Sequence, residues 1–263
     1  MSCLERVEIS DFSTVDPLDP EVLPALFAGA RRLRVLVLGA LQGSNIPASY
    51  RLESGTLEEL DVEFYRPTFV GALIASMHLP GLRTLTVRHV YSHLPYLLAN
   101  IPLLSSVDSF TAYGAIGDYG SLDNLFRSMP VLRHLDLSNS TAEAFRWYCL
   151  RVFRSAKLRV PDCSSHLRSL AVGRVSVRMV LRYLECLAGS PTYSLGITQL
   201  RMESPPADRP ATTDLEMVRA IVKDFSLTKK YFYPRDSDSG FVGTTTHLLT
   251  GATVHSLFTS LAQ

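Results

Sequence analysis

The chain has 263 residues, of which 46% are hydrophobic and 19% are charged. This balance is typical of a folded globular protein and excludes an intrinsically disordered chain. The formal net charge of +1, from 26 basic and 25 acidic residues, provides no overall field that would attract nucleic acid or an anionic membrane. We therefore predict no nucleic-acid partner and no membrane partner.

The cysteines and the chain ends favour an intracellular protein. Cys3, Cys149, Cys163 and Cys186 form no CxxC pair, so neither a zinc site nor a disulfide framework is indicated. The first 20 residues carry six charged side chains and lack the apolar stretch of a secretory signal. Residues 239–263 carry no charged side chain, but they are too polar for a membrane span and predict a terminal amphipathic helix. We expect a cytoplasmic or nuclear protein that binds no metal and no cofactor.

A six-residue window with aliphatic residues at its first, fourth and sixth places recurs along the chain. In an extended strand the fourth and sixth residues lie on one face, and the first enters from the preceding turn. Each window therefore predicts a short strand of a shared core, and we expect the strands to pair in parallel. The eight copies are Leu4, Val7, Ile9; Leu33, Leu36, Leu38; Leu57, Leu60, Val62; Leu82, Leu85, Val87; Leu104, Val107, with Ser109 in the last place; Leu132, Leu135, Leu137; Leu167, Leu170, Val172; and Ile197, Leu200, Met202.

Between the windows, apolar residues recur at helical spacing, which predicts helices that return the chain. Successive windows begin 29, 24, 25, 22, 28, 35 and 30 residues apart, and most of these steps fall within the spacing of leucine-rich repeats. The predicted helical segments contain Val22, Leu23, Leu26, Phe27; Phe69, Leu73, Ile74, Met77; Leu122, Leu125, Phe126, Met129; Phe145, Trp147, Tyr148, Val152, Phe153; and Met179, Val180, Tyr183, Leu184, Leu187.

The windows at residues 33–38 (LRVLVL) and 132–137 (LRHLDL), with the segments 80–82 (PGL) and 130–132 (PVL), resemble leucine-rich-repeat proteins of the F-box type. The uneven steps are similar to those of fungal F-box-like proteins. This resemblance implies an α/β leucine-rich-repeat solenoid, with a curved parallel sheet on the concave side and helices on the convex side. We expect one domain over residues 1–263, with clear repeats at 4–205 and an irregular C-terminal repeat or cap at 206–263.

The same resemblance implies a function in protein binding. Members of this family recognise the substrates of a ubiquitin ligase, and an N-terminal F-box segment joins them to a cullin-type ligase. No such segment is seen before the first window, which leaves open whether Met1 is the true start. We expect the substrate-recognition repeat domain of an F-box-like ligase subunit, or else a non-catalytic scaffold or regulatory repeat protein without ligase association.

The residues between the aliphatic places would point away from the core and form an exposed face whose charges alternate in sign between strands. This pattern favours either a recognition face for a protein of complementary charge or a solvated face with cross-strand Arg to Glu pairs. The candidate partner-binding residues are Arg34, Glu58, Glu59, Asp61, Arg83, Asp108, Arg133, His134, Asp136 and Arg168.

Other polar groups carry weaker signals. His89 and His93 have the spacing of zinc ligands on a helix, but they cross a predicted strand end. His134 and Asp136 share one strand face without a nucleophile motif. The basic and aromatic residues at 229–235 would suit nucleic acid, although an edge segment with buried rings is the commoner structure. We therefore predict a protein that is not an enzyme.

Overall fold

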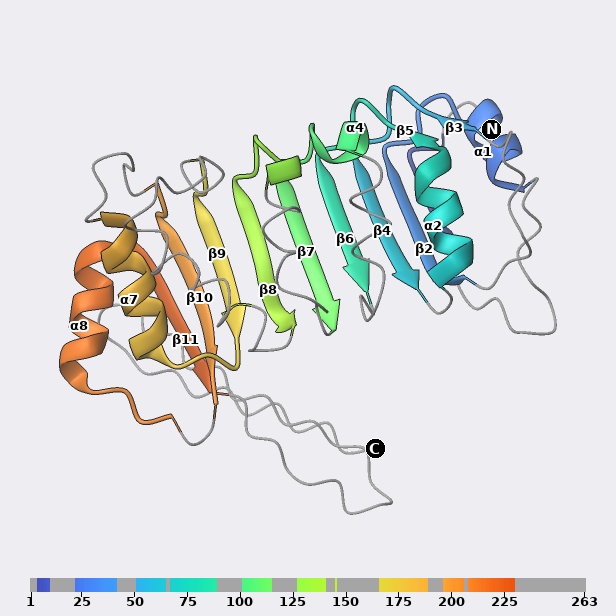
Figure 1. Cartoon of the computed structure of the whole chain (residues 1–263). Coiled ribbons are helices and arrows are strands. Elements are labelled where there is room, and N and C mark those ends of the chain that lie inside the picture. Colours follow the sequence, from blue (N-terminus) through green and yellow to red (C-terminus); the bar gives the residue numbers. More distant parts are fainter. Residues whose placement is uncertain are drawn as a thin grey trace, which may run out of the picture. The chain divides into compact units, whose positions relative to one another are not determined.

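The computed structural model describes residues 4–9, 22–41, 51–64, 67–88, 101–114, 127–140, 145, 166–188, 196–205 and 208–229. Across this part of the chain, nine strands form one large sheet in which neighbours along the chain are also neighbours in space (Figure 1). In order across the sheet they are β1 (Arg6–Ile9), β2 (Val35–Leu41), β4 (Glu59–Phe64), β6 (Thr84–Arg88), β7 (Ser109–Gly114), β8 (His134–Ser140), β9 (Ser169–Gly173), β10 (Gln199–Ser204) and β11 (Asp224–Lys229). The predicted α/β class with a parallel sheet is confirmed.

A second, two-stranded parallel sheet consists of β3 (Leu52–Glu53) and β5 (Met77–His78). Met77 was expected at the end of a helix, and this expectation is wrong because its backbone pairs with Leu52. The described helices are α1 (Val22–Gly29), α2 (Pro67–Ser76), α4 (Ile101–Leu104), α7 (Val177–Ala188) and α8 (Thr212–Ile221). None of them is long and apolar enough to cross a membrane.

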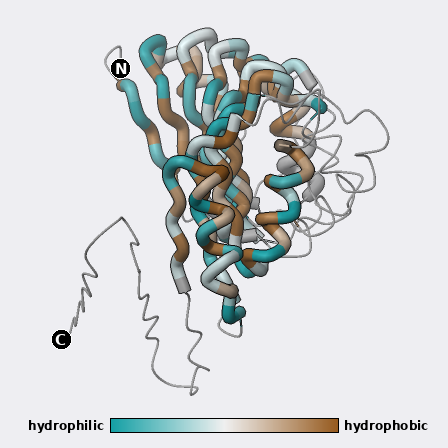
Figure 2. The backbone as a smooth tube through the Cα atoms, turned by 90° about the vertical axis from the view of Figure 1, so that its left-hand side faces the viewer, coloured by the Kyte–Doolittle hydropathy of each residue, from teal (hydrophilic) through white to brown (hydrophobic). Residues whose placement is uncertain are grey.

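The predicted helices at α1, α2 and α7 are confirmed, and α7 shows best why such segments are helical. Its buried residues recur three and four places apart, which is the spacing of one face of an α-helix. Helices α7 and α8 lie on one side of the neighbouring strands (Figure 2). The buried residues of α7 are Val177, Val180, Leu181, Tyr183, Leu184 and Leu187.

The chain divides into two compact units. Unit 1 comprises Met1–Leu135 and Pro161–Leu167, and unit 2 comprises Asp136–Val160 and Arg168–Gln263. Strand β6 in unit 1 illustrates the pattern of the sheet, because Thr84, Thr86 and Arg88 are half-buried while Leu85 and Val87 between them are at most 1% exposed. Such alternation places one face of a strand in the core and leaves the other polar.

The core of unit 1 contains a continuous row of residues from neighbouring strands. Val7, Leu36, Leu60, Leu85 and Phe110 are aligned across β1, β2, β4, β6 and β7. The last four are at most 2% exposed. From β2 to β7 each fourth-place residue is therefore buried, as the windows predicted, except that the member from β7 is Phe110.

The predicted window at Leu104, Val107 and Ser109 is wrong by three residues. Strand β7 pairs Phe110 with Leu85, and Phe110 and Ala112 are both 0% exposed, whereas Ser109 lies on the opposite face. Val107 therefore occupies the first place of the corrected window, with Phe110 in the fourth place and Ala112 in the sixth. The window failed because it admitted only aliphatic residues at its fourth place, where a phenylalanine fills the same space. With Val107 as the start, the steps of 22 and 28 residues become two steps of 25.

In unit 2, the same preference for aliphatic residues concealed a further strand. Residues 206–263 were expected to form an irregular C-terminal repeat or cap, and there β11 pairs in parallel with β10 and places Phe225 beside Leu200. Val222 is 1% exposed and Leu227 is 6% exposed. The set Val222, Phe225 and Leu227 starts 25 residues after Ile197 and again has phenylalanine in the fourth place.

Candidate functional site

The strands carry a polar face opposite the buried rows, and all ten predicted binding residues are exposed or half-buried. We call the outward side chains of the sheet strands, with the residues just before each strand, the polar face of each unit. The residues in unit 1 are Arg34, Glu58, Glu59, Asp61, Arg83, Asp108, Arg133 and His134, and those in unit 2 are Asp136 and Arg168.

In unit 1, a series of residues just before the strands carries charges of alternating sign. The backbone N–H of each member donates to the carbonyl oxygen of the preceding member, at 2.7–2.9 Å, so that the side chains start at the same level of neighbouring strands. The sequence windows did not reveal the full alternation, because they misplaced Asp108 by three residues. We call this series the charge ladder: Glu5, Arg34, Glu58, Arg83, Asp108 and Arg133.

Two pairs of neighbouring members of the charge ladder form ion pairs. Arg34 Nη2 donates to Glu58 Oε2 at 2.7 Å, and Arg83 Nη1 lies 3.9 Å from Asp108 Oδ2. The hydrogen bond from Arg34 lowers the pKa of Glu58, and the charges of Arg34 and Arg83 act in the same direction. The same hydrogen bond raises the pKa of Arg34. These contacts are the cross-strand pairs that the sequence left as the alternative to a binding face.

We expect the pKa of the Glu58 carboxyl to lie below its ordinary value, and Arg34→Gln to raise this pKa by removing the hydrogen bond. Because the folded-state pKa is the lower one, the pair stabilises the fold above the unfolded-state pKa of about 4.3, and this contribution is lost as the pH falls through the folded-state value. Carboxyl carbon NMR during a pH titration measures the pKa. Arg83→Gln should raise it less, and equal effects of the two variants would contradict the assignment.

A second cluster in unit 1 joins three strands around Arg88. The Asp61 carboxylate accepts two hydrogen bonds from Arg88, from Nε at 2.9 Å and from Nη2 at 2.7 Å. The guanidinium carbon lies 4.8 Å from the centroid of the Tyr113 ring. A bidentate ion pair combined with a ring contact holds a guanidinium in one orientation. The Asp61 bond raises the pKa of Arg88 further above its ordinary range.

The sequence windows missed Arg88 and Tyr113, although both are part of the polar face. Each occupies the seventh place counted from its window's start, one residue beyond the window and on the same side of the strand as the fifth place. Extending the six-residue pattern by one position would have found Arg88, but Tyr113 also requires the corrected start at Val107. Asp61, a predicted binding residue, is therefore already bound by Arg88 within the fold.

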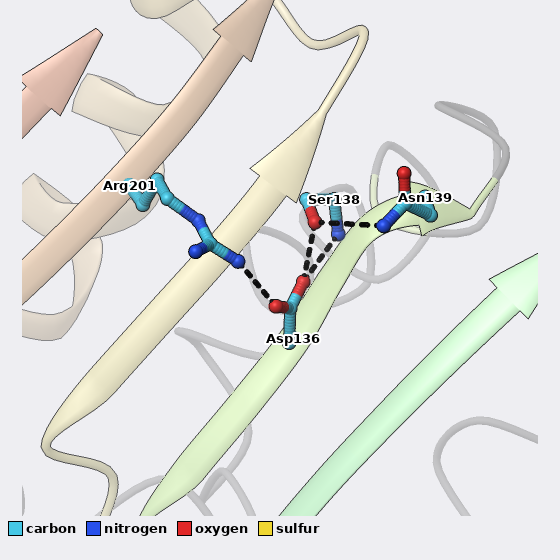
Figure 3. Close-up of polar contacts among 4 residues, drawn as sticks. All are labelled: Asp136, Ser138, Asn139 and Arg201. Carbon is cyan, nitrogen blue, oxygen red and sulfur yellow. Dashed lines mark hydrogen bonds and ion pairs between the residues drawn. The ribbon is translucent and has the colours of Figure 1, made fainter. Parts of the chain in front are cut away.

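In unit 2, Asp136 is held by contacts from β8 and β10 (Figure 3). Its Oδ1 accepts from the Ser138 backbone N–H at 2.9 Å and from the Ser138 hydroxyl at 2.6 Å, and its Oδ2 forms an ion pair with Arg201. Arg201 reaches across β9, where its register partner is Ala171. A small residue there lets the arginine pass, and Ala171 is 6% exposed.

These contacts also describe the chemistry available to Asp136. The Ser138 hydroxyl donates its proton to a carboxylate that Arg201 neutralises, and the Asn139 amide donates weakly to the same hydroxyl at 3.5 Å. A nucleophilic serine would instead donate to a base such as an imidazole. The arrangement therefore resembles a connection between strands more than a catalytic site.

The remaining sequence signals are divided between described and undescribed residues. His89, His93 and residues 230–235 lie outside the described residues, as does the segment 239–263. Within the part that the structure describes, no group of three or more His, Cys, Asp or Glu side chains is placed to hold a metal ion. In unit 2, Arg168 Nη1 donates to the carbonyl oxygen of Gly196 at 3.3 Å.

Three predicted residues of unit 1 differ from the paired ones. Glu59, Arg133 and His134 are exposed, and no side-chain hydrogen bond or ion pair to another described residue engages them. Glu59 also lies near enough to Arg34 to contribute to the raised pKa of that residue. Charged side chains that the fold does not neutralise are the ones most available to an incoming molecule.

Comparison with models of known protein families and with curated proteins finds no match. Among the described residues, the Arg34–Glu58 and Asp61–Arg88 pairs connect neighbouring strands, and Glu59 and Arg133 are exposed.

Proposed function

We propose that the chain is a leucine-rich-repeat solenoid that binds another protein through its polar face and catalyses no reaction. The alignment of window residues in neighbouring strands and the steps of 24 and 25 residues between them support the solenoid. In such a stack each unit buries its apolar side against its neighbours, which leaves a broad strand surface for recognition. The observation that carries the binding function is that Glu59 and Arg133 are exposed on that surface and form no ion pair with another described residue.

Glu59 and Arg133, both on the polar face of unit 1, are the residues that best support a partner of complementary charge. The neighbouring Arg34–Glu58 and Asp61–Arg88 pairs hold the surface around Glu59 in place. A partner that supplies the opposite charge there gains attraction without first breaking an internal ion pair. Such complementarity raises association rates and specificity more than it raises affinity.

The resemblance of the windows to F-box-type proteins supports a narrower role, in which the partner is a substrate that a ubiquitin ligase modifies. A scaffold or regulatory protein would use the same face without a ligase. Affinity capture of the full chain followed by mass spectrometry separates these roles. Recovery of a cullin-type ligase together with a partner supports the ligase subunit, and repeated recovery of a partner alone supports the scaffold.

We expect Glu59→Lys to weaken capture of the partner about tenfold, equivalent to about 1.4 kcal/mol, because it reverses a charge that forms no ion pair with another described residue. The unfolding free energy should change by less than about 0.5 kcal/mol, as is usual for surface substitutions. Quantitative pull-down and urea unfolding measure the two effects. Reversal of Glu58 or Asp61 would be less informative, since each would also break an ion pair with an arginine.

The matched control is Glu216→Lys, which makes the same chemical change at an exposed position of α8. It should leave capture unchanged. If Glu59→Lys and Arg133→Glu both bind the partner as tightly as this control does, the polar face of unit 1 is not the contact surface.

A further inference from the structure

The edge of unit 1 at β1 leaves apolar residues uncovered that are buried elsewhere in the sheet. Strand β1 is the first in the sheet order and pairs with β2, and among the described residues no strand pairs with its other edge. Leu4 is 39% exposed, and Val7 and Ile9 are half-buried. Their counterparts one strand further in, at the same places, are Leu33 at 1%, Leu36 at 0% and Leu38 at 0%.

Helix α1, which follows β1 in the chain, has the same character. Its sequence, VLPALFAG, contains no polar side chain, yet Leu23 is its only buried residue among those the structure describes, and Val22 is 44% exposed. A helix that is apolar on every side is normally covered on every side. An open strand edge together with uncovered apolar side chains is a surface for another strand.

The side chains of β1 restrict which strand can pair there. Arg6 and Glu8 point to the polar face and Val7 and Ile9 to the core, so one short segment carries both charges and an apolar side. In an antiparallel pair, directly opposite residues lie on the same face of the sheet. If two copies of β1 pair about a two-fold axis, that axis must therefore pass between the two copies of one residue, which then face each other. An axis between two successive residues would place the apolar side chains of β1 opposite its polar ones.

A pair centred on Ile9 would place both charges opposite residues beyond the end of β1. Among the three other central residues, Arg6, Val7 and Glu8, only one gives a complementary arrangement of charges. A pair centred on Arg6 places two arginines opposite each other, and a pair centred on Glu8 places two glutamates opposite each other. A pair centred on Val7 instead aligns Arg6 of each copy with Glu8 of the other, and it places the two Val7 side chains together on the core face. Opposite charges at facing positions stabilise a strand pair, and like charges destabilise it.

We propose that β1 is a self-association edge, where it pairs antiparallel with β1 of a second copy of this chain about a two-fold axis at Val7. The charged residues that select this register are Arg6 and Glu8. Within one chain, Arg6 Nη2 lies 3.9 Å from Glu8 Oε2. A closed two-fold pair uses both open edges and leaves none for further growth at this end, so the product is a dimer. The dimer extends the sheet and covers the apolar residues of β1.

The full chain should sediment as a concentration-dependent dimer in analytical ultracentrifugation. Arg6→Glu places acidic groups opposite each other at both symmetry-related positions, and Glu8→Arg does the same with basic groups. Each variant should raise the dimer dissociation constant about tenfold or more. Arg219→Glu, a charge reversal at an exposed position on α8, is the control and should leave the constant unchanged.

Mixing the two variants provides the sharpest test of the register. The acidic edge of the Arg6→Glu chain matches the basic edge of the Glu8→Arg chain, so the mixture should form a heterodimer although neither variant dimerises well alone. The double variant R6E/E8R should dimerise like the natural chain. A natural chain that stays monomeric at about 100 µM, or a dimer that neither single variant weakens, would overturn the proposal. Either result would leave the protein-binding function of the polar face untouched, because Glu59 and Arg133 are tested by partner capture.

Discussion

Replacement of Phe110 by alanine is expected to lower the free energy of unfolding by about 3 to 5 kcal/mol, the usual cost of removing a large buried ring. The Phe110 side chain is 0% exposed and lies beside Leu85 in the core row of unit 1. The surrounding strands are hydrogen-bonded to each other and can collapse only partly into the space that the ring leaves. Urea unfolding followed by circular dichroism measures the change.

The neighbouring substitution Ser109→Ala is the matched control for the position of β7. Ser109 lies on the polar face and is half-buried, so its loss should cost less than about 1 kcal/mol. A window that begins at Leu104 makes the opposite prediction, because it places residue 109 in the core. A larger loss of stability from Ser109→Ala than from Phe110→Ala would show that the register of β7 given above is wrong.

Gly173→Ala is expected to be the second strongly destabilising change, by about 3 kcal/mol, because a new methyl group would be forced into a backbone. In unit 2, a Cβ atom at Gly173 would overlap the carbonyl oxygen of Ser138 and would lie 2.7 Å from its carbonyl carbon. A neighbouring side chain could rotate away, but a strand backbone can give way only by disturbing its own hydrogen bonds. We expect a lower melting temperature and a lower urea midpoint.

Gly55→Ala tests whether this effect comes from the close approach or from the loss of a glycine in general. A Cβ atom at Gly55 meets no atom within 4 Å, so this variant should be as stable as the natural chain within about 0.5 kcal/mol. If both variants lose the same stability, the contact between Gly173 and Ser138 is not the cause. The comparison also tests the packing that holds Asp136 and Ser138 on β8.

The strand positions were predictable because each depends on only a few neighbouring residues. Leu36, Leu60 and Leu85 were placed correctly in aligned, parallel strands, since alternation of buried and exposed residues is a local property of an extended chain. Phe110 and Phe225 were missed for a chemical reason. A search limited to aliphatic residues cannot recognise a ring that fills the same core position, and the error moved Asp108 out of its true place in the charge ladder.

The exposed face was predictable as a set of residues, but the state of each charge was not. The sequence identified Glu58, Glu59 and Asp61 alike as candidates for binding a partner. Glu58 is engaged by Arg34, 24 residues earlier, and Asp61 by Arg88, 27 residues later, while Glu59 has no ion pair with a described residue. Separations of this size become contacts only when a specific register brings two strands together.

Local pattern thus accounts for which residues enter the core, because burial follows from alternation along a strand and from spacing along a helix. The pairing of side chains between strands has a different origin, since moving one strand by a single residue would exchange its two faces and change every cross-strand neighbour. The passage of Arg201 over Ala171 to Asp136 depends on such a register across β8, β9 and β10. The apolar residues of β1 likewise have ordinary core identities, and only the tertiary structure shows that Leu4 is 39% exposed while Leu33, at the same place one strand further in, is 1% exposed.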